Sequence, residues 1–198
     1  WSPHRFQVAE EVDFMLFLGS NFVQRVPVKL GKFKLKKVPA GKYTCQVVSK
    51  HFYSFWDDQC EVTAGGKLKK TIALSPILNP GQARIVLEWG KKPKDLDSHL
   101  ATPKQAPKRR RRSHRRRRKS KPCTVSYKKK HCLKGSVRLD VDQRKGFGPE
   151  TVTIDAWVPG EYTYRVNDYG ARGKSDVLLA SHAEVAVYTQ DYVKVFEV

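Results

Sequence analysis

The stretch Arg84-Ile-Val-Leu-Glu-Trp89 carries its apolar residues in a short burst, close to period two, that is typical of a β-strand. Similar bursts occur at Val26-Pro-Val28-Lys-Leu30, Phe33-Lys-Leu35, Thr44-Cys-Gln-Val-Val48, Thr151-Val-Thr-Ile-Asp-Ala-Trp157 and Tyr162-Thr-Tyr-Arg-Val166. Turn residues separate them, as at Pro39-Ala-Gly41 and Pro159-Gly160. Phe6 to Phe17 could be helical, but its pattern fits a strand at least as well. The sequence therefore predicts an all-β protein of antiparallel, immunoglobulin-like β-sandwiches.

A domain boundary is indicated by Ser75-Pro-Ile-Leu-Asn-Pro-Gly81, where an apolar run ends in proline and glycine before the next strand. We therefore expect two tandem sandwiches, residues 1–80 and 81–198. A basic insert at 103–122 interrupts the second sandwich, because residues 104–121 hold 12 of the 39 Lys and Arg residues and no acid. Such a segment repels itself and belongs to no core.

Composition limits the class of protein. The chain has 198 residues, a formal net charge of +20, and 39% hydrophobic residues, which is enough for a buried core. No window approaches the ~18 consecutive apolar residues of a membrane helix, so a membrane span is not expected. The chain starts at Trp1 without an initiator Met, from which we expect a processed or partial chain.

Each half of the chain resembles a known family. The first half, about residues 6–78, resembles the carboxypeptidase regulatory-like, transthyretin-like domain. The resemblance rests on two segments, Gly31-Lys-Phe-Lys-Leu-Lys-Lys-Val-Pro-Ala-Gly-Lys-Tyr-Thr44 and Thr71-Ile-Ala-Leu-Ser-Pro76. This resemblance implies a non-enzymatic sandwich that serves as a spacer or docking unit.

The second half of the chain, about residues 83–198, resembles the YfaP-like domain of secreted and surface proteins, which has no assigned function. The resemblance rests on segments that occur in order: Leu87-Glu-Trp-Gly-Lys-Lys-Pro-Lys-Asp-Leu-Asp-Ser-His-Leu100, Leu139-Asp-Val-Asp142, Gly146-Phe-Gly-Pro-Glu-Thr151 and Pro159-Gly-Glu-Tyr162. The basic insert sits where that family has a short loop, so the resemblance implies nothing about its role.

The four cysteines fall two to each predicted domain, so we expect disulfides Cys45–Cys60 and Cys123–Cys132, each closing a hairpin. The first pair would stand opposite each other across a hairpin with its tip at 52–55. The second hairpin would need a bulge or a longer loop, because Tyr127-Lys128 is a poor two-residue turn. Zinc is disfavoured because no Cys-x-x-Cys spacing occurs. Disulfides predict an oxidising compartment, hence an extracellular or cell-surface protein of the secretory pathway.

Acidic residues gather near two predicted strands. Strand alternation places Asp95, Asp97 and His99 on one face and Asp140 and Asp142 on one face of another strand, with Glu150 following. These oxygens could supply part of a calcium site, the one cofactor that the sequence suggests. The alternative is that the Asp side chains cap turns and bind backbone amides. A carboxylate pair for acid/base catalysis is a third interpretation, and we expect no catalytic residues.

The basic insert is the other candidate site. Arginine pairs with phosphate, sulfate and carboxylate, so an acidic polymer or acidic protein surface is the expected partner. The polyanion-binding candidates are Arg109, Arg110, Arg111, Arg112, Arg115, Arg116, Arg117, Arg118 and Lys119. A solvated loop without a partner and a dibasic processing site are the alternatives. Nucleic acid is less favoured because no aromatic residue interrupts the run.

Two functions remain open. The first is a non-catalytic structural or interaction protein of the extracellular surface, in which the insert docks on an acidic neighbour within an assembly of protein subunits. The second is a polyanion-binding module for acidic polysaccharide or nucleic acid. A metal-dependent enzyme ranks third, since Gly-x-Ser-x-Gly and phosphate-binding glycine loops are absent from the sequence.

Overall fold

The chain is all-β and forms several antiparallel sheets, as the spacing of its apolar residues predicts. The computed structural model describes residues 12–66, 71–105, 122–170, 178 and 181–198. They divide into two compact units, Trp1–Ile77 and Leu78–Val198. Within the described residues the helical element with defined bounds is one 3-10 turn, Leu133–Gly135.

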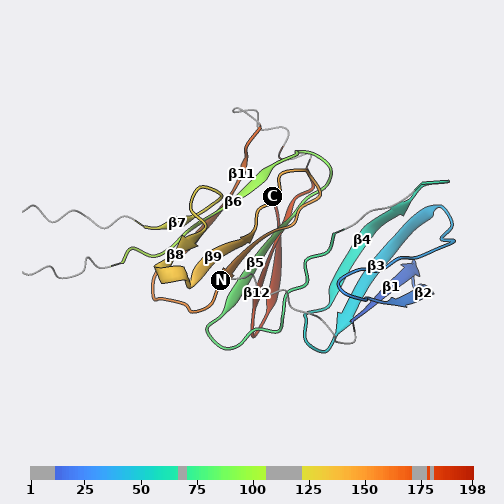
Figure 1. The fold of residues 1–198 in the computed structure, drawn as a ribbon, viewed down its shortest axis with the longest axis horizontal. Coiled ribbons are helices and arrows are strands. Elements are labelled where there is room, and N and C mark those ends of the chain that lie inside the picture. Colours follow the sequence, from blue (N-terminus) through green and yellow to red (C-terminus); the bar gives the residue numbers. More distant parts are fainter. Residues whose placement is uncertain (1–11, 67–70, 106–121, 171–177, 179–180) are drawn as a thin grey trace, which may run out of the picture. The chain divides into compact units, whose positions relative to one another are not determined.

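The first unit contains one four-stranded antiparallel sheet in the order β2-β1-β3-β4 (Figure 1). Its strands are β1 (Val12–Leu18), β2 (Asn21–Pro27), β3 (Gly41–Ser49) and β4 (Phe55–Val62). Alternation along β1 turns Val12, Phe14 and Leu16 to the buried face, where each is at most 3% exposed. The segment from Phe6 to Phe17 is therefore a strand where it is described.

Two segments outside the strands of that sheet cover its buried face. Phe33, Leu35 and Val38 pack against the core from one segment, and Ile72 and Leu74 pack against it from the other. Phe33-Lys-Leu35 is not a strand, although its alternation predicts one, and the stretch 71–76 forms an isolated bridge between Pro76 and Phe52 rather than a strand. Alternation selects which side chains face the core, but a strand also needs a neighbour for its backbone hydrogen bonds.

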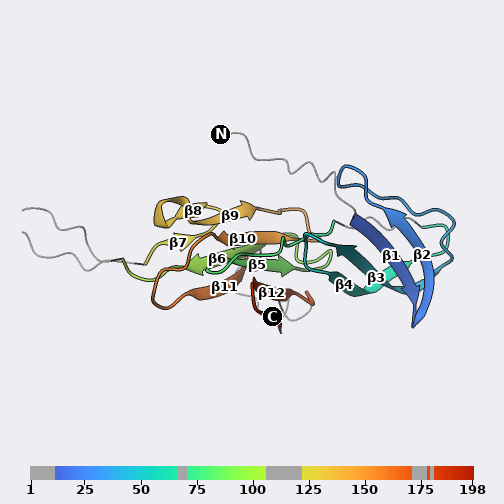
Figure 2. The same ribbon diagram turned by 90° about the horizontal axis from the view of Figure 1, so that it is seen from below.

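The second unit contains two antiparallel sheets, with strand orders β13-β12-β5-β10-β9-β8 and β11-β6-β7 (Figure 2). The larger sheet consists of β5 (Ala83–Glu88), β8 (His131–Cys132), β9 (Val137–Val141), β10 (Glu150–Ile154), β12 (Glu184–Thr189) and β13 (Val193–Glu197). The smaller consists of β6 (Leu96–Ala101), β7 (Thr124–Val125) and β11 (Thr163–Asp168).

One core is shared by these two sheets. Leu87 on β5 and Ile154 on β10 contribute from the larger sheet, and Leu96 and Leu100 on β6 contribute from the smaller. All four are at most 1% exposed. The apolar burst from Arg84 to Trp89 thus corresponds to β5, an inner strand of the larger sheet. It is hydrogen-bonded to β10 on one side and to β12 on the other.

Both predicted disulfides are present. Cys45 and Cys60 have Cα atoms 6.0 Å apart, and those of Cys123 and Cys132 are 5.9 Å apart. Two details of the prediction are wrong. Cys60 stands opposite Tyr43 rather than Cys45, because the β3–β4 register shifts at a bulge between residues 43 and 45.

The second wrong detail concerns Tyr127-Lys128, which forms a two-residue turn although a bulge or a longer loop was expected there. Ser126 and Lys129 exchange two backbone hydrogen bonds of 3.0 Å across it. The turn therefore closes without the bulge or longer loop expected from its residue types.

The two disulfides indicate an oxidising environment, as in secreted proteins. Among the residues described, no helix is long and apolar enough to span a membrane.

Candidate functional site

The acidic site is formed where β9 and β10 are joined by a loop that folds back on the segment after β5. Gly146 donates its N–H to the Lys94 carbonyl at 2.6 Å, and Phe147 donates to Gly90 at 2.7 Å. Gly146 has φ 72°, and a Cβ there would lie 2.7 Å from the Lys91 carbonyl oxygen, so only glycine fits this close approach. The loop is thereby held in place with Asp142 at its start and Glu150 at its end.

The Glu150 side chain, from β10, lies against a part of β6 that has no strand neighbour on one side. The strand β7 pairs with β6 only at Leu100 and Ala101, so the preceding part of β6 has no strand neighbour on that side. The Glu150 Oε2 atom accepts the Ser98 N–H there at 2.7 Å. Ser98 in turn shares a 2.7 Å hydrogen bond between its hydroxyl and that of Tyr164. The carboxylate thus replaces a missing strand partner.

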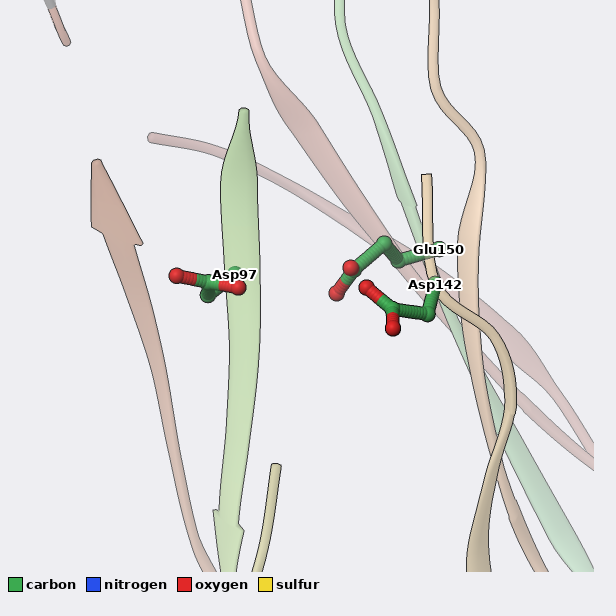
Figure 3. A group of neighbouring side chains, drawn as sticks. All are labelled: Asp97, Asp142 and Glu150. Atoms are coloured by element: carbon green, nitrogen blue, oxygen red, sulfur yellow. The ribbon is translucent and has the colours of Figure 1, made fainter. Parts of the chain in front are cut away.

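Three carboxylates meet at this edge (Figure 3). Asp97 on β6, Asp142 after β9 and Glu150 on β10 each offer an oxygen, and these oxygens all lie within 4.8 Å of one another. Glu150 is 0% exposed and Asp97 is 3% exposed. The Oε1 atom of Glu150 and the Oδ2 atom of Asp97 are buried and have no hydrogen-bond partner among the residues that the structure describes. Such atoms are costly to bury unless a proton or a cation joins them.

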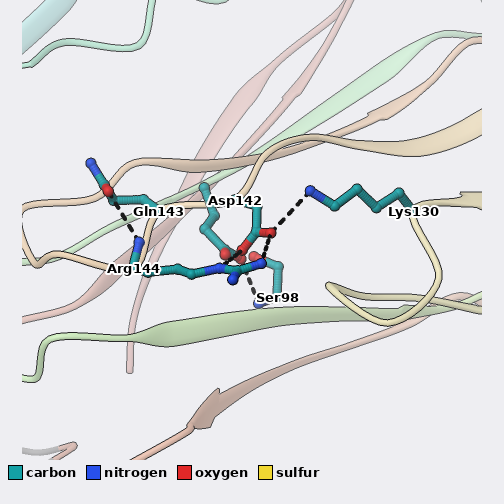
Figure 4. A network of polar contacts seen from close by, with 6 residues as sticks. Ser98, Lys130, Asp142, Gln143 and Arg144 are labelled. Atoms are coloured by element: carbon teal, nitrogen blue, oxygen red, sulfur yellow. Dashed lines mark hydrogen bonds and ion pairs between the residues drawn. The ribbon is translucent and has the colours of Figure 1, made fainter.

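Asp142 differs from the other two because cations already contact it (Figure 4). Its Oδ2 atom lies 2.9 Å from the Lys130 ammonium and 2.8 Å from the Arg144 guanidinium. Both cationic side chains are largely exposed, at 45% and 64%. Sequence reasoning missed both residues: Arg144 stands two positions from Asp142, which is a usable signal, but nothing in the sequence links Lys130 to the site.

The protonation behaviour follows these contacts. Burial raises the pKa of Glu150 to about 7, an effect opposed by the hydrogen bonds from Ser98 and increased by the charges of Asp97 and Asp142. Burial, then the charge of Asp95, raises the pKa of Asp97. The hydrogen bond from Arg144, with that from Lys130, lowers the pKa of Asp142. The site therefore holds one ionised carboxylate beside two that resist ionisation.

The other acidic candidates lie around or outside this group. Asp95 precedes β6, and burial followed by the charge of Asp142 raises its pKa. His99 lies further along β6 and is not one of the three, its ring lying 6.3 Å from that of Tyr127.

Asp140 is not part of the group either. It binds Arg138 at 2.8 Å and accepts a hydrogen bond of 2.5 Å from the Thr153 hydroxyl. The expectation that Asp140 and Asp142 share a strand face is wrong. The β9–β10 register shifts between Thr151 and Val152, and β9 ends at Val141, so simple alternation does not extend across both residues.

The base of the basic insert is the second feature of interest. Both the N–H and the hydroxyl of Thr102 bind the carbonyl of Cys123, at 2.8 and 3.1 Å. Cys123 is bonded to Cys132. Pro103 is buried against Gly160, where a Cβ would approach it to 2.7 Å. The polyanion-binding candidates, residues 109–112 and 115–119, lie outside the described residues.

No protein-family model matches this chain, and the search of solved structures finds no match to its fold.

Proposed function

We propose that this chain is a non-catalytic interaction protein of the extracellular or cell surface, in which the Arg-rich insert docks on an acidic partner. It would act as one subunit of a larger assembly, with two tandem β-domains that are each stapled by one disulfide. The observation that carries the proposal is the firm base of the insert. Thr102, Pro103 and Cys123 are fixed by hydrogen bonds, packing and a disulfide at the points where the basic segment leaves and rejoins the fold.

The charge of the insert supports an anionic partner. Residues 104–121 carry 12 Lys and Arg residues without an acid, and such a charge density is stable only in water or against carboxylate, sulfate or phosphate groups. The two disulfides support a compartment in which acidic polysaccharides and acidic protein surfaces are the available anions. The resemblance of residues 83–198 to a domain of secreted and surface proteins agrees with this placement.

The acidic site supports a non-catalytic interpretation. Glu150 and Asp97 are 0% and 3% exposed, so neither carboxylate can reach a substrate without opening of the second unit. Asp142 is in addition engaged by Lys130 and Arg144. A general acid or base must instead lie within hydrogen-bond reach of the proton that it transfers.

The test compares two variants of the full oxidised chain on immobilised heparin, a sulfated polysaccharide. In the first, the eight arginines at 109–112 and 115–118 become serine. In the second, five exposed lysines of the 29–37 segment in the first unit become serine, namely Lys29, Lys32, Lys34, Lys36 and Lys37. We expect the first variant to elute at much lower salt and to show a smaller salt dependence, and the second to lose less per charge removed.

The outcomes separate the hypotheses. Equal losses per charge in the two variants would contradict a docking role for the insert and leave only general electrostatic attraction. Binding to single-stranded nucleic acid that is as tight, and as dependent on the eight arginines, would favour the polyanion-binding module instead. Circular dichroism of both variants should match that of the parent chain, since no core residue is changed.

A further inference from the structure

The buried carboxylates of the second unit require a partner that the described residues do not provide. Asp97, Asp142 and Glu150 come from three different segments, yet their oxygens converge within 4.8 Å. Glu150 Oε1 and Asp97 Oδ2 are buried without a hydrogen-bond partner in the described ranges, and the same holds for Asp95 Oδ1 just before β6. Figure 3 shows the carboxylates of Glu150 and Asp142 directed toward Asp97 across the gap between the strands.

Hydrogen bonding to backbone amides accounts for only part of this arrangement. It explains the position of Glu150 Oε2, which accepts the Ser98 N–H, but it leaves Oε1 facing the other acids. Lys130 and Arg144 do not satisfy the group either, because the hydrogen bonds of their side chains go to Asp142. Both side chains are exposed and can move into water at little cost. Within the described part of the chain, no cationic side chain therefore forms an ion pair with Asp97 or Glu150.

The donor set selects the type of ion. All three groups are carboxylates, which suit hard cations, whereas zinc favours nitrogen and sulfur ligands. Oxygens within 4.8 Å of one another can surround an ion that binds oxygen at about 2.3 to 2.6 Å, the range of calcium. Magnesium needs a shorter and more regular octahedron. Calcium takes six to eight oxygens, so water and the neighbouring Asp95 could complete the shell.

We propose that Asp97, Asp142 and Glu150 form a calcium-binding site that ties β6 to the loop between β9 and β10. This inference is independent of the proposed docking role of the insert, because none of its residues belongs to that segment. Bound calcium would join the two sheets of the second unit at the edge where β7 is too short to do so. It would thereby stabilise the second unit and leave the first unit unchanged.

The experiment uses the full oxidised chain after treatment with a chelator. Isothermal titration with calcium chloride should show one binding site, and hydrogen exchange should slow in β6 and in residues 142–150. Magnesium and zinc chlorides should bind more weakly at the same concentrations. Extracellular calcium modules bind in the range of about 0.1 to 1 mM, so the titration should extend to several times that range.

Three variants make the result decisive. Glu150→Gln and Asp97→Asn should each abolish calcium binding and the slowed exchange. Glu150→Gln keeps an oxygen that can accept the Ser98 N–H, so it should fold, and its exchange pattern without calcium checks this directly. Asp191→Asn removes an exposed carboxylate in the turn after β12 and should bind calcium like the parent chain.

Two results would overturn the proposal. One is the absence of calcium-dependent heat and exchange protection in the parent chain. The other is a folded Glu150→Gln variant that binds calcium as tightly as Asp191→Asn does. In either case the buried carboxylates would be joined by shared protons rather than by a metal ion.

Discussion

The two units bury different kinds of side chain. The first covers one sheet with non-strand segments, and the polar side chains that it buries, Gln46 and Ser75, are uncharged. The second encloses its core between two sheets and also buries Asp97 and Glu150. The difference lies in the strand edges: β1 has β2 and β3 on its two sides, whereas β6 loses its neighbour where the two-residue β7 ends. A short strand inside a two-sheet unit thus leaves backbone amides at which a carboxylate is buried, and no buried carboxylate occurs among the described residues of the first unit.

Removing a core side chain should reveal how differently the units are packed. Leu87→Ala deletes a fully buried residue of the central strand β5 and should cost the second unit about 3 to 5 kcal/mol. Phe33→Ala deletes a half-buried ring that stacks on Phe14 at 4.1 Å and should cost the first unit about 1 to 2 kcal/mol. Urea unfolding monitored by hydrogen exchange measures the free energy of unfolding of each unit separately.

Each of these substitutions should leave the other unit's free energy of unfolding unchanged. The exposed edge strand β13 offers the control, since Val195 is 54% exposed and Val195→Ala should have little effect. A larger loss of stability from Phe33→Ala than from Leu87→Ala would contradict the view that the covering segments of the first unit contribute less packing energy than the central strand of the second.

The buried carboxylate should make the second unit sensitive to pH. The pKa of Glu150 is raised from 4.5 to about 7, so folding favours the protonated side chain. The parent chain therefore loses stability as pH rises through about 4.5 to 7, by at most about 3 kcal/mol from this residue. Glu150→Gln lacks this loss, so its advantage over the parent should be near zero at pH 4.5 and largest at pH 8.

The groups that face Glu150 set the controls for that measurement. Asp97 on β6 and Asp142 after β9 raise its pKa, while Ser98 lowers it through hydrogen bonds. Lys130 and Arg144 act mainly on Asp142. Unfolding is followed with a chelator present, so that no cation contributes. A difference between the two chains that does not change from pH 4.5 to 8 would show that Glu150 ionises without penalty.

Sequence periodicity predicted the strands of the second unit better than the covering of the first. The burst from Arg84 to Trp89 alternates within a real ladder, because β10 and β12 stand beside it. Phe33-Lys-Leu35 alternates equally well, yet its side chains pack on the core without a neighbouring strand. The sequence of a segment contains its own pattern of apolar residues but not the position of its partner.

The acidic site was predictable in part for the same reason. Asp97, Asp142 and Glu150 are three of the six residues from which the sequence suggested a calcium site, and their oxygens lie together. The exclusion of Asp140 depends on a register shift opposite Thr151 and Val152, which alternation alone does not reveal. The contact of Lys130 with Asp142 depends on how the turn at 126–129 folds, a feature that the residue types there did not indicate.

The smallest expected effect concerns two turns of equal length, one in each unit. In the first unit Leu30-Gly31 joins Lys29 to Lys32 through two backbone hydrogen bonds of 2.9 Å. Both central residues have positive φ, 52° and 69°, which is the type I′ conformation that favours Asn-Gly. Leu30 is also 83% exposed, so its side chain gains little from packing. Leu30→Asn should therefore stabilise the first unit by about 0.5 to 1 kcal/mol.

The matching turn in the second unit supplies the control. Tyr127-Lys128 also closes a two-residue turn, but neither residue has a positive φ, so asparagine relieves no strain there. Lys128→Asn should leave the stability of the second unit unchanged within about 0.5 kcal/mol, as expected for an exposed surface position. Urea unfolding of both variants checks the pair. Equal effects from the two substitutions would mean that asparagine acts through the unfolded chain, and that the left-handed conformation of Leu30 imposes no cost on the first unit.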